Sequence, residues 1–178
     1  KGFGLRAIAN EATGYAHSSD IDKASLKRAS DTVSFITNNN KGNYNSNFNR
    51  TNKKLYSDLN PVNSVDFKNK VKTLEEIDKY ARSINPLVKQ VSSSLSGEWQ
   101  VVRIYRPDGL LVEDIRPLVR LNISVVLEKN GRLETGSRGV GGRVDYQKFL
   151  EEDYWKKQVD GALKQAEINL QSIDSPAG

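Results

Sequence analysis

Three segments of the chain carry apolar residues at helical spacing. They run from about residue 21 to 37, from 67 to 84 and from 146 to 173, and intervals of three and four place their apolar side chains on one helix face. Asp20 and Asp22 offer carboxylate caps for the first helix, and Asn85-Pro86 ends the second. The capping-box pattern at residues 73–76 gives the second helix an alternative start as late as residue 73. The apolar positions are Leu26, Ala29, Val33 and Ile36; Phe67, Val71, Leu74, Ile77, Ala81 and Ile84; and Trp155, Val159, Leu163, Ala166, Leu170 and Ile173.

Alternation of apolar and polar residues predicts strands elsewhere. Near the start, residues 2–9 and 15–17 predict a hairpin around the turn residues 10–14. Between 87 and 144, we predict strands at 87–95, 99–105, 110–115, 118–127 and 132–139, with turns at 96–98, 106–109 and 129–132. Consecutive hairpins indicate an antiparallel sheet. The predicted fold class is α+β: an antiparallel β-meander with flanking helices, preceded by the end of a smaller α+β domain.

Residues 38–64 differ in texture from the rest of the chain. They are rich in asparagine, contain glycine, serine and proline, and show little periodicity. Such a composition favours a long, mobile surface loop or linker.

Composition narrows the classes of function. The 178 residues include no cysteine, which excludes disulfides, thiolate zinc sites and cysteine nucleophiles. The net charge of +5 is small and the basic residues are dispersed, so nucleic-acid binding is not expected. The sequence contains no stretch of eighteen apolar residues, so neither a membrane helix nor a membrane partner is expected. A chain without disulfides fits the cytoplasm, which is the predicted location.

The sequence contains no recognisable catalytic or metal-binding motif. His17 is the only histidine, so neither a zinc-binding histidine pair nor a catalytic triad is predicted. The carboxylates at 113–114 and 151–153 lack calcium-loop spacing and are read as structural. No catalytic residue, metal ligand or cofactor is therefore assigned to this chain.

Residues 138–143, with the sequence RGVGGR, are the sharpest candidate for a binding site. Glycines allow a backbone to approach a ligand closely, and two arginines can hold an anion. The alternative is a glycine-rich exit from the last strand, which we favour because no helix N-terminus follows at once. The candidate contacts to a peptide or partner are Arg138, Gly139, Gly141, Gly142 and Arg143.

The order of these signals resembles the TldD/PmbA family, known as modulators of DNA gyrase. The matching features are the first strand at 2–9, the Gly14-Tyr15-Ala16 turn-back, the cap at 18–20, the glycine-rich segment 136–143 and the ending at 175–178. The last two favour the TldD branch over the TldE (PmbA) branch. The resemblance implies a division into residues 1–37 (the C-terminal part of an N-terminal domain), 38–64 (a loop), 65–145 (a central domain) and 146–178 (a helix leading to a catalytic domain beyond the chain). We accordingly expect earlier strands of the first domain to precede Lys1.

Several functional expectations follow from this resemblance. The full-length protein would be a cytoplasmic zinc metalloprotease with an HExxxH motif beyond Gly178, acting on unfolded peptides. Its expected partner is a TldE/PmbA-like subunit, or a second copy in a homo-oligomer. The fragment would be non-catalytic, would wall the substrate chamber and would contact the partner. Two alternatives stay open: a stand-alone protein- or nucleic-acid-binding module with a weakly basic surface, and a purely structural assembly domain.

Overall fold

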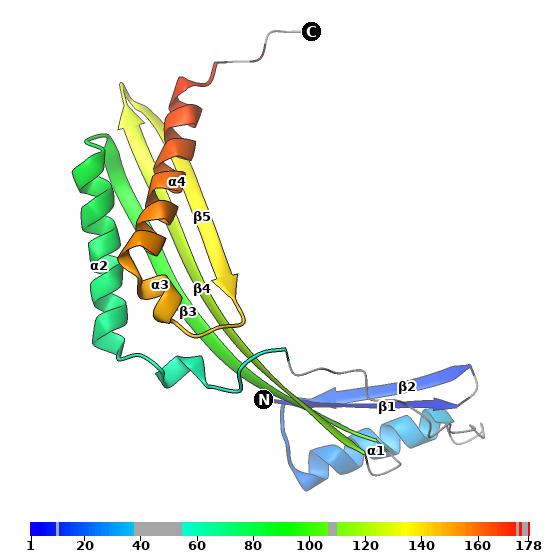
Figure 1. The fold of residues 1–178 in the computed structure, drawn as a ribbon. Coiled ribbons are helices and arrows are strands. Elements are labelled where there is room, and N and C mark those ends of the chain that lie inside the picture. Colours follow the sequence, from blue (N-terminus) through cyan, green and yellow to red (C-terminus); the bar gives the residue numbers. More distant parts are fainter. Residues whose placement is uncertain (10, 38–54, 107–109, 174, 176–177) are drawn as a thin grey trace. The chain divides into compact units, whose positions relative to one another are not determined.

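The computed structural model describes residues 1–9, 11–37, 55–106, 110–173, 175 and 178. They divide into two compact units, Lys1–Thr51 and Asn52–Gly178 (Figure 1). Most of the predicted Asn-rich loop (38–54) lies outside the described residues, as do the predicted turn residues 107–109.

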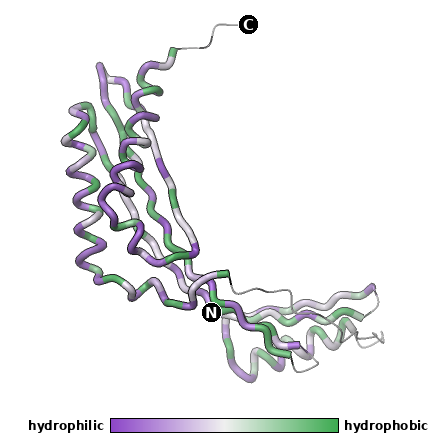
Figure 2. The backbone as a smooth tube through the Cα atoms, viewed as in Figure 1, coloured by the Kyte–Doolittle hydropathy of each residue, from purple (hydrophilic) through white to green (hydrophobic). Residues whose placement is uncertain are grey.

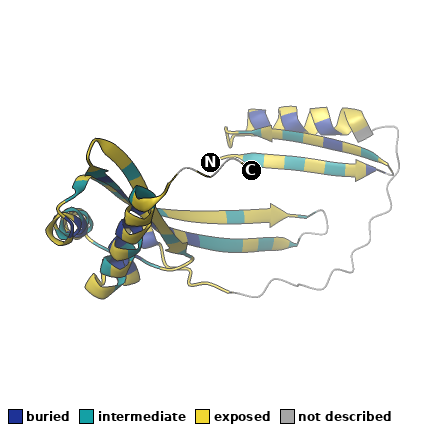
Figure 3. Cartoon of the chain, turned by 90° about the horizontal axis from the view of Figure 1, so that it is seen from above, coloured by how far each residue is buried: buried dark blue, intermediate teal, exposed yellow. Residues whose placement is uncertain are grey.

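The first unit is a hairpin with one helix. Strand β1 (Phe3–Ala9) pairs antiparallel with β2 (Ala12–Ser18), and α1 (Lys23–Thr37) packs on them. The carboxylate of Asp22 accepts a hydrogen bond from the Ser25 amide at 2.7 Å, which confirms the predicted helix cap and lowers the pKa of Asp22. Both strands are mostly exposed or half-buried (Figure 3), because two strands offer a single helix only a narrow face.

The second unit contains a three-stranded antiparallel meander in the order β3-β4-β5 (Figure 1). After the 3-10 helix η1 (Pro61–Asn63) come α2 (Phe67–Ile84), β3 (Val88–Tyr105), β4 (Leu111–Lys129), β5 (Arg132–Gly142), α3 (Gln147–Leu150) and α4 (Glu152–Gln171). The α+β fold class and the meander are confirmed.

Two predicted breaks in the sheet are wrong. Residues 96–98 form no turn, because β3 runs straight through them and Gly97 pairs with Val119. A Cβ on Gly97 would lie 2.1 Å from the hydroxyl oxygen of Tyr146, so this glycine makes room for a ring rather than a turn. Likewise, β4 continues through residues 116–117. Pro117 lies just beyond the last residue pair between β4 and β5, so its missing N–H costs the sheet no hydrogen bond.

The tip between β4 and β5 has the predicted two-residue form. Asn130 and Gly131 have φ values of 53° and 80°, the left-handed pair that a primed turn requires. Lys129 therefore pairs with Arg132, and this pairing fixes the register of the whole hairpin.

Helices α2 and α4 cover one face of the sheet and bury the core there (Figure 1). On β4, the five alternate apolar residues from Val119 to Leu127 are at most 1% exposed, and they pack under Ile77 and Val159. The apolar and polar positions of β4 alternate visibly in Figure 2. The predicted final helix is correct in its apolar stripe, but Glu151 is extended and divides it, and the helix ends at Gln171, so Ile173 is exposed.

Candidate functional site

The sheet face opposite the helices is lined by small polar side chains. Because strand residues alternate between faces, the even positions of β4 and their cross-strand neighbours share this open face. The registers form three rows across the sheet. They are Ser92–Ser124–Ser137, Ser94–Asn122–Gly139 and Ser96–Arg120–Gly141.

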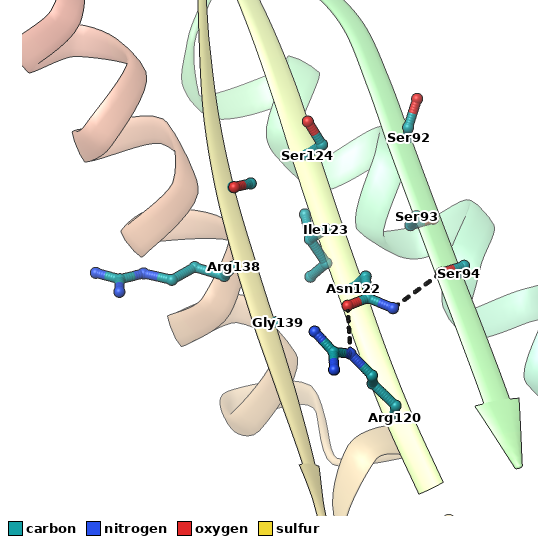
Figure 4. Close-up of a pocket in the computed structure, with 10 residues that line it drawn as sticks. Ser92, Ser93, Ser94, Arg120, Asn122, Ile123, Ser124, Arg138 and Gly139 are labelled. Carbon is teal, nitrogen blue, oxygen red and sulfur yellow. Dashed lines mark hydrogen bonds between the residues drawn. The ribbon is translucent and has the colours of Figure 1, made fainter.

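A pocket of ≈ 330 Å³ lies on this face (Figure 4). Arg120 Nε donates to Asn122 Oδ1 at 2.8 Å, and Asn122 Nδ2 donates to Ser94 Oγ at 3.3 Å. A Cβ on Gly139 would lie 3.0 Å from both Arg120 Nη2 and Asn122 Oδ1, so the glycine leaves space for the arginine on the face. The pocket is lined by Ser92, Ser93, Ser94, Arg120, Asn122, Ile123, Ser124, Ser137, Arg138 and Gly139.

Arg138 and Arg143, the two predicted contact arginines, lie in different surroundings. Arg138 turns away from the open face toward α4 (Figure 4), where a Cβ on Gly161 would meet its Nε at 2.6 Å. Arg143 follows the end of β5; its Nη1 donates to the Pro117 carbonyl oxygen at 3.5 Å and its guanidinium lies over the ring of Tyr56. The described contacts of the two arginines share no residue.

Gly139, Gly141 and Gly142 lie on an edge strand. The Ser137 amide donates to Gln165 Oε1 at 3.0 Å and Asn169 Nδ2 donates to the Thr135 carbonyl oxygen at 2.9 Å, so these strand residues direct their backbone groups away from β4. Successive strand residues alternate in this direction, and Gly139 and Gly141 therefore present their amide and carbonyl groups along the same edge. Neither glycine has a hydrogen-bond partner on this side among the described residues.

The described side chains do not suit a catalytic metal ion. No group of three histidine, cysteine or acidic residues lies together among them. His17 stacks on Tyr15, with ring centroids 5.8 Å apart. Of the carboxylates flagged in the sequence, Glu113 pairs with Arg103, and Asp114 with Arg116.

Sequence reasoning located the glycine edge but missed the polar face beside it. Arg120, Asn122 and the serines belong to no motif, and single serines carry no chemical signal by themselves. A usable signal was nevertheless present: the predicted alternation over 118–127 puts every even residue on the face away from the core. Reading that second face as a surface would have found the pocket.

Comparison with known proteins identifies the family. Residues 60–170 match the model of the PmbA/TldA metallopeptidase central domain. The chain belongs to the PmbA/TldD family. Its whole length is similar to the metalloprotease TldD homolog of Haemophilus influenzae (39% identical, 100% of this chain and 38% of the relative). A homolog of the same name from Buchnera aphidicola of Acyrthosiphon pisum is 34% identical over 99% of this chain. The chain thus spans 38% of the length of these relatives.

Solved structures share the fold of this PmbA/TldD chain. A candidate DNA gyrase modulator from Thermotoga maritima aligns with a TM-score of 0.73 at 13% identity, over 99% of this chain and 39% of that one. TldE from Thermococcus kodakarensis aligns with a TM-score of 0.60 at 16% identity, over 91% and 36%. At these identities the likeness concerns the fold. Among the described residues, no helix is long and apolar enough to cross a membrane.

Proposed function

We propose that this chain is a non-catalytic part of a TldD-type metalloprotease, in which it walls the substrate chamber and contributes to subunit contact. The observation that carries the proposal is the 39% identity to the Haemophilus influenzae TldD homolog along the entire chain. That relative is named a metalloprotease, and this chain corresponds to 38% of its length. The remaining length leaves room for a separate catalytic domain.

In this proposal, zinc is held outside the chain. No three histidine, cysteine or acidic side chains lie together among the described residues, which supports this part of the proposal. The metal and the general base would then come from a histidine- and glutamate-bearing helix of the catalytic domain, following Gly178. Zinc there would activate the water that attacks the peptide.

The role of this chain in the proposal is to hold an extended peptide. An edge strand with free backbone groups can accept another strand, and main-chain hydrogen bonds of this kind bind unfolded segments without demanding one sequence. The Gly139–Gly141 edge supports this role, as does the polar pocket beside it. The subunit partner would be a TldE/PmbA-like chain or a second copy, in the cytoplasm.

Hydrolysis and metal content of two proteins test the proposal. We expect the full-length protein to bind one zinc ion per chain and to hydrolyse an unfolded peptide such as a quenched fluorescent casein fragment. The 178-residue chain should do neither. Hydrolysis by this chain alone would overturn the non-catalytic role, and a full-length reading frame without HExxxH after Gly178 would overturn the protease assignment.

The proposed contact between subunits is tested by sedimentation. Sedimentation of the full-length protein with and without a TldE-like chain should show a stable complex. The alternative of a nucleic-acid-binding module predicts instead that an oligonucleotide binds and that its affinity falls steeply as salt rises.

A further inference from the structure

We propose that the stretch of the β5 edge from Gly139 to Gly142 binds an acidic segment in extended conformation, with Arg120, Arg138 and Arg143 pairing its carboxylates. This inference rests on the proposed function, because it names the class of peptide that the edge receives. Three features of the described residues lead to it: an uncovered position, or gap, beside α4, a group of arginines without carboxylate partners, and the repulsion that these arginines would cause between two copies of the strand.

The gap arises from the spacing of residues along α4. Asn169 and Gln165 each cover an outward-facing backbone group of β5, and the next α4 residue in this row, four positions earlier, is Gly161. Four helix residues rise ~6 Å and two strand residues ~6.7 Å, so the row keeps in step with alternate strand residues. The residue in step with Gly139 is Gly161, which has no side chain to bond its backbone; the Arg138 side chain lies beside this glycine. The edge is therefore closed at Thr135 and Ser137 and uncovered at Gly139. Lys157 is the α4 residue in step with Gly141, and no described hydrogen bond joins the two.

The open stretch lacks the devices that block sheet edges. It contains neither proline nor lysine, and its four residues carry one side chain larger than hydrogen, that of Val140. An incoming strand meets unhindered amide and carbonyl groups at Gly139 and Gly141. The open edge is short, so it accommodates a strand of a few residues.

The arginines around this edge differ from four other arginines of the unit. Four arginines pair with carboxylates: Arg82 with Asp78, Arg103 with Glu113, Arg116 with Asp114 and Arg132 with Glu134. Among the described residues, Arg120, Arg138 and Arg143 have no carboxylate within ion-pair distance. Arg120 donates to an amide oxygen, Arg143 to a carbonyl oxygen and lies over an aromatic ring, and Arg138 occupies the space that a side chain at Gly161 would need.

These three cations flank the open edge on both sides of the sheet. Arg120 lies on the open face, where its Nη2 is 3.0 Å from the Cβ position of Gly139, and Arg138 lies on the helix face. Arg143 stands at the end of the strand. Adjacent residues of a bound strand point to opposite faces. Two consecutive acidic residues would therefore place one carboxylate beside Arg120 and the other beside Arg138, and guanidinium–carboxylate pairs are the strong, geometrically specific kind.

The same charges argue against a second copy of this chain as the occupant. In antiparallel registers centred on Val140 or Gly141, Arg138 of each chain falls opposite a residue next to Arg143 of the other. Four guanidinium groups would then crowd along one short strand pair, and like charges across strands are destabilising. An acidic segment of another polypeptide removes this repulsion.

Binding of two matched peptides to the 178-residue chain tests the proposal. The probes are fluorescein-labelled decapeptides, Ser-Val-Thr-Val-Glu-Glu-Val-Thr-Val-Ser and its Gln-Gln counterpart, followed by fluorescence anisotropy. We expect the acidic peptide to bind at least tenfold more tightly. Equal affinities would overturn the acidic class. N-methylation of alternate residues along one edge of the acidic peptide should abolish binding, since strand addition needs those amides.

Variants of the chain locate the site. Gly139→Pro removes the outward amide without touching the β4 ladder and should abolish binding of both peptides, whereas Gly139→Ala keeps the amide and should bind within threefold of the parent. Gly161→Gln adds an amide in step with Gly139 and should lose binding; because its Cβ would lie 2.6 Å from Arg138 Nε, it also displaces that side chain, and Arg138→Gln is its matched comparison. Unchanged affinity in Gly139→Pro and Gly161→Gln would overturn the edge as the site.

Charge variants distinguish specific pairing by the arginines from a general effect of the net charge. Arg120→Gln and Arg138→Gln should each weaken the acidic peptide several-fold and leave the Gln-Gln peptide unchanged. Lys79→Gln, an equal loss of charge on the outer side of α2, should change neither; a matching loss in this control would overturn specific pairing. Displacement of the peptide by oligothymidylate would assign the arginines to nucleic acid. Dimers that Gly139→Pro dissociates would assign the edge to a second copy.

Failure of this inference can be told from failure of the proposed function. If the full-length protein hydrolyses peptides and the edge variants leave both binding and hydrolysis unchanged, the protease role stands and the acidic site falls. If the acidic peptide binds as expected but the full-length protein hydrolyses nothing and holds no zinc, the proposed function falls and the site stands.

Discussion

The Arg132 side chain binds the backbone of Ser172: guanidinium Nη1 donates to the Ser172 carbonyl oxygen at 2.8 Å. The Nη2 atom donates to the Asn169 carbonyl oxygen at 2.9 Å, so the residue at the start of β5 caps the C-terminal end of α4. A cation at this helix end also opposes the partial negative charge of the final carbonyls. The contact joins two segments about forty residues apart in sequence.

Loss of this cap should loosen the last turn of α4. We expect Arg132→Gln to lower the free energy of unfolding by about 1–2 kcal/mol, because several charge-assisted hydrogen bonds at a partly exposed site are lost. Amide hydrogen exchange should quicken at 169–172 and stay unchanged at the centre of the helix. Lys129→Gln, across the same turn, is the matched control. Equal exchange in both variants would contradict the capping role.

Gly136 marks the closest approach of β5 to α4. A Cβ there would lie 1.9 Å from the Ala162 carbonyl oxygen, which is backbone and cannot swing aside. Gly136→Ala should therefore destabilise the unit by about 3 kcal/mol or more, measured by urea unfolding. Gly139→Ala meets only flexible side-chain ends and should cost less than about 1 kcal/mol. Similar midpoints for the two variants would refute this packing.

Gly97 and Tyr146 should be energetically coupled. Gly97→Ala drives a methyl group into the Tyr146 ring, so we expect a loss of about 2–3 kcal/mol in the parent background. In a Tyr146→Ala background, which is itself destabilised, the added methyl group should cost much less. A double-mutant cycle measures the difference. Additive losses would show that the ring does not press on the glycine.

Stability should fall at alkaline pH. Burial raises the pKa of Tyr80, and the carboxylate of Asp160, whose Oδ1 accepts a hydrogen bond from the Tyr80 hydroxyl group at 3.1 Å, raises it further. The folded chain therefore holds this proton more tightly than the unfolded chain, whose tyrosines titrate near pH 10. The contribution is fully present below pH 10 and is lost as pH rises through the folded-state pKa.

Tyrosine variants identify the residues whose titration causes this loss of stability at alkaline pH. Tyr80→Phe should flatten part of the decline in unfolding free energy above pH 10. Tyr146→Phe should flatten another part, since burial raises the pKa of Tyr146 as well. An identical decline in the parent and in both variants would place the titration elsewhere.

Local sequence patterns were sufficient to predict most helices and strands. The wrongly predicted turn at 96–98 arises from a tertiary contact. The α2 and α4 stripes and the Asn130-Gly131 turn are encoded within a few residues each, so their positions could be predicted. Gly97 could not, because its neighbour Tyr146 lies 49 positions away and a glycine between polar residues resembles a turn. For the candidate site, the glycine edge is visible as composition. The gap at Gly161 becomes visible only once the strand and helix are aligned.

The two-residue turn at Asn130-Gly131 also decides what the molecule shows to its surroundings. Side-chain and backbone directions repeat every two residues along a strand, so one inserted residue in this turn would invert all of β5 relative to β4. The backbone of Val140 would then replace the glycines along the outer edge, and Arg138 would move to the serine-lined side. Whether this turn has an even or an odd number of residues thus determines which of two different surfaces the eleven residues of β5 form.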